Sequence, residues 1–326
     1  MILERYLKQI IIPQISKVGQ KKLLNSHILI VGGGGLAVPV IQYLAGAGIG
    51  NISIIDGDKV SLDNLHRQTL FKEKDIGHFK VDVLKKFVKN LNSNIKLKVF
   101  NFYANPSNIH DLCLMVDIVV DCADNFATTY FLSDHCLEKN LCFVTASVSL
   151  FSGYAGTFCK NAPSVRAVFP DLPNNNNSCN TEGVLGTSVG MIGSLQAQLV
   201  IFYLLRINNT IGQLYIFNTE DFRISNFNFL DAKEPKNSFK FLSKNNIKND
   251  DLVFDLRDEK KNEDLVSSNA FRCSLEEYIK EVSVPSKCHN RVVFCCKTGL
   301  RAWKAAKKLE MKWQGEIFLL AEQERG

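Results

Sequence analysis

The 326-residue sequence lacks several features that mark other classes of protein. It contains 10 cysteines but no Cys-x-x-Cys pair, so a standard structural zinc site is not expected. Its longest apolar run, Leu199 to Leu205, is too short to cross a bilayer. Its first residues, Met1 to Gln9, carry charges, and no signal-peptide cleavage pattern follows them. We therefore expect a cytoplasmic protein with no membrane attachment.

A large excess of charge of one sign is also missing. Lys and Arg number 39 and Asp and Glu 33, which gives a net charge of +6 with only short basic runs such as Lys304 to Lys308. A nucleic-acid-binding protein would show a basic stripe, so we expect no nucleic-acid partner. With 46% hydrophobic residues the chain is too apolar to be disordered as a whole. In such a chain, scattered cysteines fit reduced, mostly buried thiols better than a disulfide framework.

Strand-like and helix-like patterns alternate through the first half of the chain. Strands are expected at 27–31, 51–55, 96–100, 117–121 and 143–147, and helices at 36–47 and 80–91. This alternation predicts a mainly parallel sheet covered by helices, that is, an α/β, Rossmann-like domain. A polar loop around 163–177, a helix at 183–205 and a hairpin of strands at 213–218 and 223–229 follow.

A second, smaller α/β pattern lies near the end of the sequence. Strands are expected at 252–256, 291–295 and 316–320, with helices at 274–281 and 299–309. The stretch between the two patterns is rich in Lys, Asn and Asp, which is typical of a linker. We predict a first domain over residues 1–232, a linker over 233–248 and a second domain over 249–326.

A glycine-rich turn directly follows the first expected strand and opens a helix. Gly32, Gly34 and Ala37 occupy the fixed positions of the pattern G-x-G-x-x-[G/A]. Glycines let backbone amides approach phosphate oxygens, and the helix N-terminus adds positive potential. Asp56 ends the next strand, where a carboxylate can bind ribose hydroxyls. This pattern predicts a nucleotide site but does not separate NAD from ATP.

A set of polar residues then follows at the ends of predicted strands. Arg67 and Lys80 can clamp a triphosphate, the first through its planar fork and the second as a point charge. Asp124 ends a strand at the carboxyl edge of the sheet, where it can hold Mg²⁺ or orient the phosphates. The other members of the set are Asp58, Asn64, Gln68 and Asn125. NAD does not need this cluster of cations, so the set favours ATP.

The order and spacing of these motifs resemble the ThiF/MoeB/HesA family of ubiquitin-activating-enzyme-like proteins over about residues 1–230. The matching motifs are Arg5-Tyr-Leu-Lys-Gln9, the Gly32 turn, Asp58 to Gln68, Gly77-His-Phe-Lys80 and Asp121-Cys-Ala-Asp-Asn125. The resemblance implies adenylation, with ATP and Mg²⁺, of the C-terminal glycine of a small ubiquitin-like sulfur-carrier protein, with release of pyrophosphate. It also implies a homodimer, and the helix at 184–206 is its expected interface.

By this resemblance each polar residue has a role. Asp56 binds ribose, and Asp124 sits with the metal. The phosphates are handled by Asn64, Arg67, Gln68 and Lys80. The N-terminal motif of the family usually has a second arginine that reaches a partner subunit's ATP site. Here Arg5 is present and Lys8 stands in place of the second arginine, which keeps the charge but loses the planar fork.

The sequence departs from the family at the zinc ligands. Many members carry two Cys-x-x-Cys pairs, and these would fall near Ser164-Val-Arg-Ala167 and near residues 228–240. Neither segment contains a cysteine. We predict that the protein has no zinc site.

Two cysteines are candidates for chemistry. Cys179 precedes the helix expected at 183–205, and a thiol near a helix N-terminus gains thiolate character. Some family members use a cysteine here for a covalent link with the carrier or its sulfur, and others do not need it. Cys179 is therefore either a catalytic thiol or an exposed loop cysteine.

Cys296 opens a loop that runs from the end of a strand to Arg301, at the start of a helix. Backbone amides and Arg301 would face the thiolate there. The loop, together with Asp255-Leu-Arg257, resembles the active site of rhodanese-like domains, in which the loop cysteine carries a persulfide. Neighbouring Cys295 is expected to point into the sheet core, because alternate strand residues face opposite sides.

These observations lead to a function and to three alternatives. The favoured function is adenylation of a carrier like those of thiamine or molybdopterin biosynthesis, followed by transfer of persulfide sulfur from Cys296 to give a thiocarboxylate. A cysteine desulfurase or another sulfur donor would supply the persulfide. The alternatives are adenylation alone with a degenerate rhodanese-like docking domain, an NAD-dependent oxidoreductase, and a non-catalytic carrier-binding protein.

Overall fold

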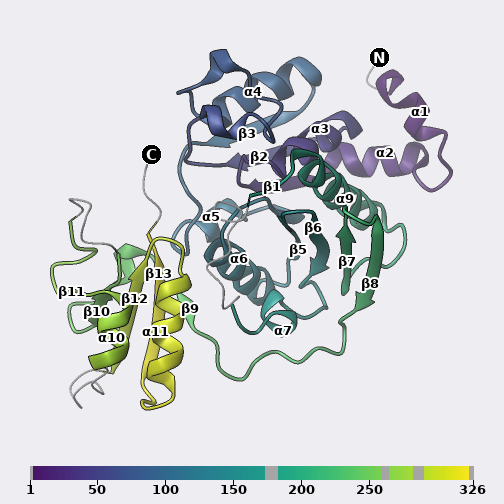
Figure 1. The fold of residues 1–326 in the computed structure, drawn as a ribbon. Coiled ribbons are helices and arrows are strands. Elements are labelled where there is room, and N and C mark those ends of the chain that lie inside the picture. The colour runs from purple at the N-terminus through teal and green to yellow at the C-terminus, as the bar shows by residue number, and fades with distance from the viewer. Residues whose placement is uncertain (1–2, 173–182, 258–263, 282–289, 323–326) are drawn as a thin grey trace.

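The computed structural model describes residues 3–172, 183–257, 264–281 and 290–322, and within these ranges it contains two separate β-sheets (Figure 1). The larger sheet has eight strands in the order β3-β2-β1-β4-β5-β6-β7-β8. The smaller has five strands in the order β11-β10-β12-β13-β9. The prediction of an α/β fold with a mainly parallel first sheet is confirmed.

The parallel part of the large sheet is formed by its first five strands. Strand β1 (His27–Val31) lies between β2 (Asn51–Ile55) and β4 (Ile118–Asp121), while β3 (Lys96–Phe100) and β5 (Cys142–Ser149) flank them. Strands β6 (Ser152–Phe158), β7 (Gln213–Asn218) and β8 (Arg223–Asn228) then continue antiparallel. The carboxyl ends of the parallel strands meet at one edge, where ligands bind in open α/β sheets.

Helices cover both faces of this sheet. On one face Ile28 and Ile30 of β1 pack against α3 (Ala37–Ala47), α4 (Lys80–Leu91) and α9 (Gly186–Leu205). On the other face Leu29 and Val31 pack in the cluster that contains α6 (Phe126–Glu138). Successive strand side chains point to opposite faces, so a continuous apolar run such as that of β1 is buried on both sides. Short helices α1 (Leu7–Ile10), α2 (Ser16–Asn25), α5 (Ile109–Leu112) and α7 (Val165–Val168) complete this part.

The smaller sheet is entirely parallel. Its strands are β10 (Leu252–Asp255), β11 (Ala270–Arg272), β12 (Arg291–Cys296), β13 (Glu316–Ala321) and the two-residue β9 (Lys240–Phe241), and its helices are α10 (Leu275–Glu281) and α11 (Leu300–Glu310). Strand β9 falls inside the stretch predicted to be a linker. The domain boundaries after residues 232 and 248 remain a prediction.

The two sheets are joined through β9 and α6, which lie side by side (Figure 1). One continuous apolar cluster contains Ala127 and Phe131 of α6 together with Phe241 of β9, Cys296 and Trp303. Polar contacts add to it, because the Ser107 amide donates to Ser243 Oγ over 2.9 Å. We refer to residues 240–321 as the C-terminal unit.

Helix α9 is the one helix in the described part of the chain that is long and apolar enough to cross a membrane by length and composition alone. Half of its apolar window is buried. Val189, Ile192 and Val200 pack in the cluster that holds α3, so the helix has the contacts of a core helix.

Candidate functional site

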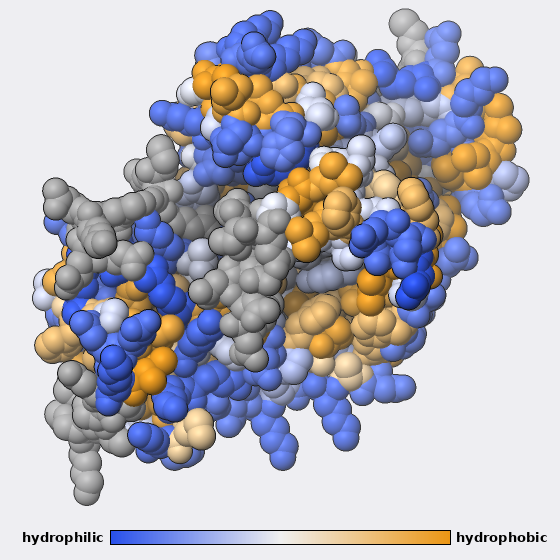
Figure 2. Space-filling view, in the orientation of Figure 1, coloured by the Kyte–Doolittle hydropathy of each residue, from blue (hydrophilic) through white to orange (hydrophobic). Residues whose placement is uncertain are grey.

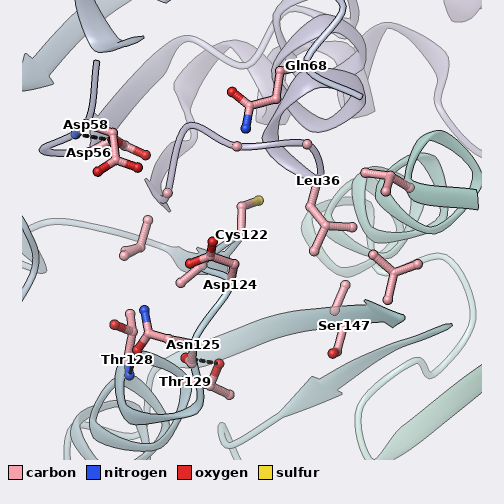
Figure 3. A pocket seen from close by; sticks show the side chains of 18 of the residues that line it. Leu36, Asp56, Asp58, Gln68, Cys122, Asp124, Asn125, Thr128, Thr129 and Ser147 are labelled. Carbon is pink, nitrogen blue, oxygen red and sulfur yellow. Dashed lines mark hydrogen bonds between the residues drawn. The ribbon is translucent and has the colours of Figure 1, made fainter. Parts of the chain in front are cut away.

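A cavity of about 360 Å³ lies at the carboxyl edge of the large sheet, between the glycine turn and the ends of β2, β4 and β5. Figure 3 shows Asp56 and Asp58 on one side of it, Leu36 at the end of the glycine turn with Gln68 above the turn, and Asp124 near the centre. We call this cavity the nucleotide pocket. It lies where the sequence pattern predicts a nucleotide.

The glycine turn has the backbone shape that the pattern requires. Gly32 has a φ of +95°, and a Cβ there would come within 2.6 Å of the Cys122 carbonyl oxygen. The Gly33 amide donates to Asp56 Oδ2 over 2.6 Å. Helix α3 begins directly after the turn, so its N-terminus faces the pocket. Only glycine allows both this φ and this approach to the 122–123 backbone.

The pKa values of the two carboxylates after β2 are shifted in opposite directions. Asp56 is buried and accepts hydrogen bonds from the Gly33 and Asp58 amides, and burial raises its pKa even though Lys80 acts against this. Burial also acts to raise the pKa of Asp58, but the Lys80 charge and hydrogen bonds from Lys80 and Tyr103 hold that pKa below its usual value. Asp58 is therefore an anion at neutral pH, paired with a buried ammonium group.

Three of the four side chains predicted to bind phosphates, those of Arg67, Gln68 and Lys80, line the pocket. Lys80 is only 4% exposed, and its Nζ lies 2.8 Å from Asp58 Oδ2. Arg67 donates to the Asp63 carbonyl over 3.1 Å. Gln68 is buried beside Gly34, and its Oε1 has no hydrogen-bond partner among the described residues. An unpartnered buried amide oxygen beside the glycine turn is a group that a bound ligand or its water can satisfy.

Two further predicted site residues lie on the turn after β4. Asp124 lines the pocket, and Asn125 caps α6 by accepting a hydrogen bond from the Thr128 amide over 2.9 Å. Nine predicted ligand residues thus meet in one pocket: Gly32, Gly34, Asp56, Asp58, Arg67, Gln68, Lys80, Asp124 and Asn125.

Four of the predicted cofactor-binding residues do not line this pocket. Ala37 is buried inside α3, and Asn64 ends a short 3-10 turn (Leu62–Asn64). Arg5 and Lys8 are exposed near the N-terminus, where Arg5 donates to the carbonyl of Leu91. Their assignment to a nucleotide remains a prediction.

Two residues, one lining the pocket and one below it, were not among the predicted site residues. Tyr103 lines the pocket and donates a hydrogen bond to Asp58 Oδ1. It follows the end of β3, and that position at the carboxyl edge is the signal that could have identified it. Asp121 is fully buried below the turn and accepts hydrogen bonds from Thr129 and Thr145, and burial raises its pKa to about 6.

The segments in which zinc ligands would fall are joined by polar side chains. Glu234 accepts hydrogen bonds from both the amide and the hydroxyl of Ser164, each over 2.6 Å. Arg166 pairs with Asp134 over 2.6 Å and donates to the Phe239 carbonyl. In the described ranges no three His, Cys, Asp or Glu residues are grouped so as to hold a metal. We call the Ser164–Glu234 and Arg166–Asp134 pairs the polar clip.

The second candidate site lies at the carboxyl end of β12. Cys296 is 1% exposed, and its Sγ accepts a hydrogen bond from the Ala302 amide over 3.4 Å. Burial raises the pKa of this thiol, although the Ala302 amide and the Arg301 charge act to lower it. The backbone amide and the arginine charge predicted to act on Cys296 are thus present, but the burial of the thiol favours its neutral form. Cys295 packs in the apolar cluster on the opposite face, as predicted.

The loop after Cys296 packs against both β9 and α6. Gly299 has a φ of +83°, and a Cβ there would lie 2.9 Å from the Phe241 ring and 3.1 Å from Ala127 Cβ. At the end of β10, Arg257 holds the buried Asp255 with two hydrogen bonds of 2.9 and 2.7 Å. The other predicted thiol, Cys179, lies outside the described residues.

Comparison with known proteins matches residues 6–239 to the ThiF family. The chain is 39% identical over 219 residues to the adenylyltransferase and sulfurtransferase MOCS3 of Caenorhabditis briggsae, a match that covers 66% of this chain and 54% of that protein. It is 35% identical over 222 residues to the SAMP-activating enzyme E1 of Haloferax volcanii, covering 67% and 82%. It is 36% identical over 219 residues to the sulfur carrier protein ThiS adenylyltransferase of Escherichia coli, covering 66% and 86%. The matched part of the chain thus spans about half the length of MOCS3.

Solved structures support the same fold. A crystal structure of Escherichia coli MccB with ATP has a TM-score of 0.56 at 22% identity, covering 67% of each chain. The structure of PaaA has a TM-score of 0.59 at 21% identity, covering 70% of this chain and 73% of that one. At these identities the likeness concerns the fold.

Proposed function

This chain belongs to the ThiF family, and from that premise we propose that it uses ATP to adenylate the C-terminal glycine carboxylate of a small ubiquitin-like sulfur-carrier protein. The observation that carries the proposal is the meeting of the glycine turn, Asp56, Arg67, Lys80 and Asp124 in one pocket. The names of the ThiS and SAMP relatives support this class of substrate.

In this function different residues of the pocket bind different parts of the nucleotide. Asp56 accepts from ribose hydroxyls, since each of its oxygens can accept more than the single amide bond it now has. The backbone amides of the Gly32–Gly34 turn bind phosphate oxygens. Arg67 and Lys80 neutralise the triphosphate, with Gln68 and Asn64 as further donors. Arg5 and Lys8, which belong to the N-terminal motif, are proposed to bind ATP, and Lys8 stands where the family's second arginine reaches the ATP site of a partner subunit.

A carboxylate is a weak nucleophile, so the reaction depends on charge neutralisation and alignment. The carrier carboxylate attacks the α-phosphorus, a new P–O bond forms, and pyrophosphate leaves with the electron pair of the broken bond. Asp124 is the carboxylate that would hold Mg²⁺ beside the phosphates. Mg²⁺ usually takes one or two protein carboxylates and completes its shell with phosphates and water, which fits this donor set. When bound, Mg²⁺ supplies further neutralisation of the leaving pyrophosphate.

The proposed second step transfers sulfur. A cysteine desulfurase or another donor places a persulfide on Cys296. Its terminal sulfur attacks the acyl-adenylate, the bond to AMP breaks, and an acyl disulfide joins the carrier to Cys296. The Cys179 thiolate then attacks the Cys296 sulfur, releasing the thiocarboxylate and leaving a Cys179–Cys296 disulfide, which an external thiol reduces. The cradle of the Ala302 amide and Arg301 supports this role.

The name of MOCS3 supports a sulfurtransferase activity beside adenylation. The family match ends at residue 239, before the C-terminal unit. Because Cys296 is 1% exposed, the sulfur step requires the 296–301 loop to open. That burial also favours the second candidate function, in which the protein only adenylates and the C-terminal unit serves as a docking module.

The proposal includes a homodimer acting in the cytoplasm, in thiamine, molybdopterin or another carrier pathway. Apolar side chains gather over α1 and α2 (Figure 2), where Leu7, Ile11 and Val18 are each more than half exposed. Leu185, directly before α9, and Met191 within α9 are partly exposed. Exposed apolar clusters of this kind are typical of association surfaces.

The test is ATP–pyrophosphate exchange by the full chain with candidate carrier proteins. We expect carrier-dependent exchange in the wild type, loss of about a hundredfold or more in Asp124→Ala, and no change in Asp82→Ala, whose carboxylate is exposed on α4. Cys296→Ser should keep the exchange and lose thiocarboxylate formation. Exchange without thiocarboxylate in the wild type would favour the adenylation-only function. A lack of exchange with every carrier would refute the proposal.

A further inference from the structure

The buried ammonium group of the nucleotide pocket is held from one side by a carboxylate. Lys80 Nζ and Asp58 Oδ2 are 2.8 Å apart, and the Lys80 amide donates to the Asp58 carbonyl over 3.0 Å. Residues 59 and 79 form a bridge between antiparallel segments, which places Asp58 opposite Lys80. The direction of the Lys80 ammonium group therefore depends on where the Asp58 carboxylate points.

The Asp58 carboxylate is in turn held by Tyr103. The Tyr103 hydroxyl donates to Oδ1, the oxygen that Lys80 does not use. The tyrosine ring packs over Gly57, where a Cβ would lie 2.9 Å from ring atoms. Since the Asp58 side chain is 45% exposed, the contact with Tyr103 is a second restraint, beside that of Lys80, that keeps the carboxylate from turning toward solvent.

The segment that carries Tyr103 is tied to the C-terminal unit. Asn108 Nδ2 donates to the Tyr103 carbonyl over 2.9 Å, and the Asn105 amide donates to Asn108 Oδ1 over 2.9 Å. Ser243 Oγ donates to Asn105 Oδ1 over 3.0 Å and accepts from the Ser107 amide over 2.9 Å. A chain of hydrogen bonds thus runs from the C-terminal unit to the backbone of Tyr103.

Tyr103 also stands between two cavities. A second cavity of about 1090 Å³ lies between residues 101–108 and the segment around Ser243, and Tyr103, Ala104 and Thr128 line both it and the nucleotide pocket. A movement of the C-terminal unit would change the wall behind Tyr103. The position of Tyr103 is therefore sensitive to how that unit docks.

We propose that Tyr103 is a positioning residue that sets the Lys80 ammonium group through Asp58, and that the hydrogen bonds of Ser243 make this setting depend on docking of the C-terminal unit. The inference rests on the proposed adenylation function. Misdirection of one cation in a preorganised site costs more in the transition state than in the ground state. Loss of Tyr103 should therefore lower kcat more than it raises the KM for ATP.

The test is a double-mutant cycle in pyrophosphate exchange, with the full chain and the carrier that the wild type uses. We expect Tyr103→Phe to lower kcat about tenfold, with KM for ATP changed less than about threefold. In a Lys80→Met background the same substitution should change kcat less than about twofold, because the group it positions is gone. Tyr130→Phe is the matched control, since its hydroxyl donates to the Phe169 carbonyl away from the pocket.

The dependence on docking of the C-terminal unit is tested with Ser243→Ala. Ser267→Ala is the control, because the Ser267 hydroxyl bonds Asn269 inside the C-terminal unit. We expect Ser243→Ala to lower kcat about threefold in the wild type and not further in Tyr103→Phe. Melting temperatures confirm that each variant is folded.

The result that overturns the inference is a tenfold effect of Tyr103→Phe that persists in Lys80→Met, or no effect in either background. If the wild type binds ATP without exchange, the adenylation function fails, and the same cycle is then measured in the Kd for ATP. Additive changes in Kd would overturn the inference there too, whereas coupling would support it separately from adenylation.

Discussion

The buried carboxyl group of Asp121 makes the stability of this fold depend on pH. It ends β4, is fully buried, and accepts hydrogen bonds from Thr129 over 2.6 Å and Thr145 over 2.8 Å. Burial raises its pKa to about 6 in spite of these bonds. A carboxyl group whose folded-state pKa exceeds its unfolded value of about 4 stabilises the fold at low pH, and that contribution is lost as pH rises through about 6.

We therefore expect the wild type to lose about 2 kcal/mol of unfolding free energy relative to Asp121→Asn between about pH 4.5 and pH 8. Asparagine stays neutral over this range, so the difference between the two proteins isolates the Asp121 proton. Guanidinium unfolding at several pH values measures it. A difference that does not change with pH would mean that Asp121 is already ionised throughout in the folded state.

At the scale of elements, the polar clip holds together two segments that are far apart in the sequence. The carboxylate of Glu234 bonds two groups of Ser164, and Arg166 joins α7 to Asp134 of α6 and to the Phe239 carbonyl. Charged groups in such bonds contribute about 1.5–3 kcal/mol each. The clip therefore supplies a cross-link between segments that carry no cysteine.

We expect Glu234→Ala to lower the free energy of unfolding by about 2 kcal/mol, whereas a metal chelator leaves the melting temperature of the wild type unchanged. Glu73→Ala, which removes an exposed glutamate, is the control for the loss of one charge. Calorimetry with and without chelator measures both effects. A melting temperature that falls with chelator would show that a metal stabilises the fold.

The elements that could be predicted are those whose pattern is local. Strands β1 and β2 and helix α4 lie where the sequence places them, because buried β-branched runs and a 3.6-residue apolar spacing are visible in short windows. The sequence does not predict helix α6, because residues from Ala127 to Ser133 are all buried and show no polar face. It does not predict strand β6, because two glycines interrupt it, or strand β9, because two residues give no pattern.

The residues of the candidate site also fall into those that the sequence can predict and those that it cannot. The glycine turn, Asp56, Lys80 and Asp124 belong to spaced motifs, and they meet because parallel strands end at one edge. Tyr103 belongs to no motif, and its importance comes from a contact with Asp58, 45 residues away in the sequence. The burial of Cys296 comes from contacts of its loop with α6 and β9, which only the tertiary structure reveals.

At the scale of the whole molecule, the two sheets share one apolar cluster and should not unfold independently. Ala127 and Phe131 of α6 belong to the same cluster as Phe241 and Trp303 of the C-terminal unit. The chain has 2 tryptophans, Trp303 and Trp313, and both lie in that unit. Tryptophan fluorescence therefore reports the unfolding of the C-terminal unit alone, while far-ultraviolet circular dichroism reports the whole chain.

This arrangement gives a direct test of coupling between the units. ATP at about 100 times its Kd stabilises whatever unfolds together with the nucleotide pocket by about 2.7 kcal/mol. We expect the fluorescence transition of Trp303 and Trp313 to shift by the same amount as the circular dichroism transition, although ATP binds only the first part of the chain. Lys80→Met, with weakened phosphate binding, should show smaller shifts in both signals. If the dichroism midpoint moves while the fluorescence midpoint stays, the C-terminal unit unfolds on its own, and the shared cluster contributes too little to join the two sheets into one cooperative unit.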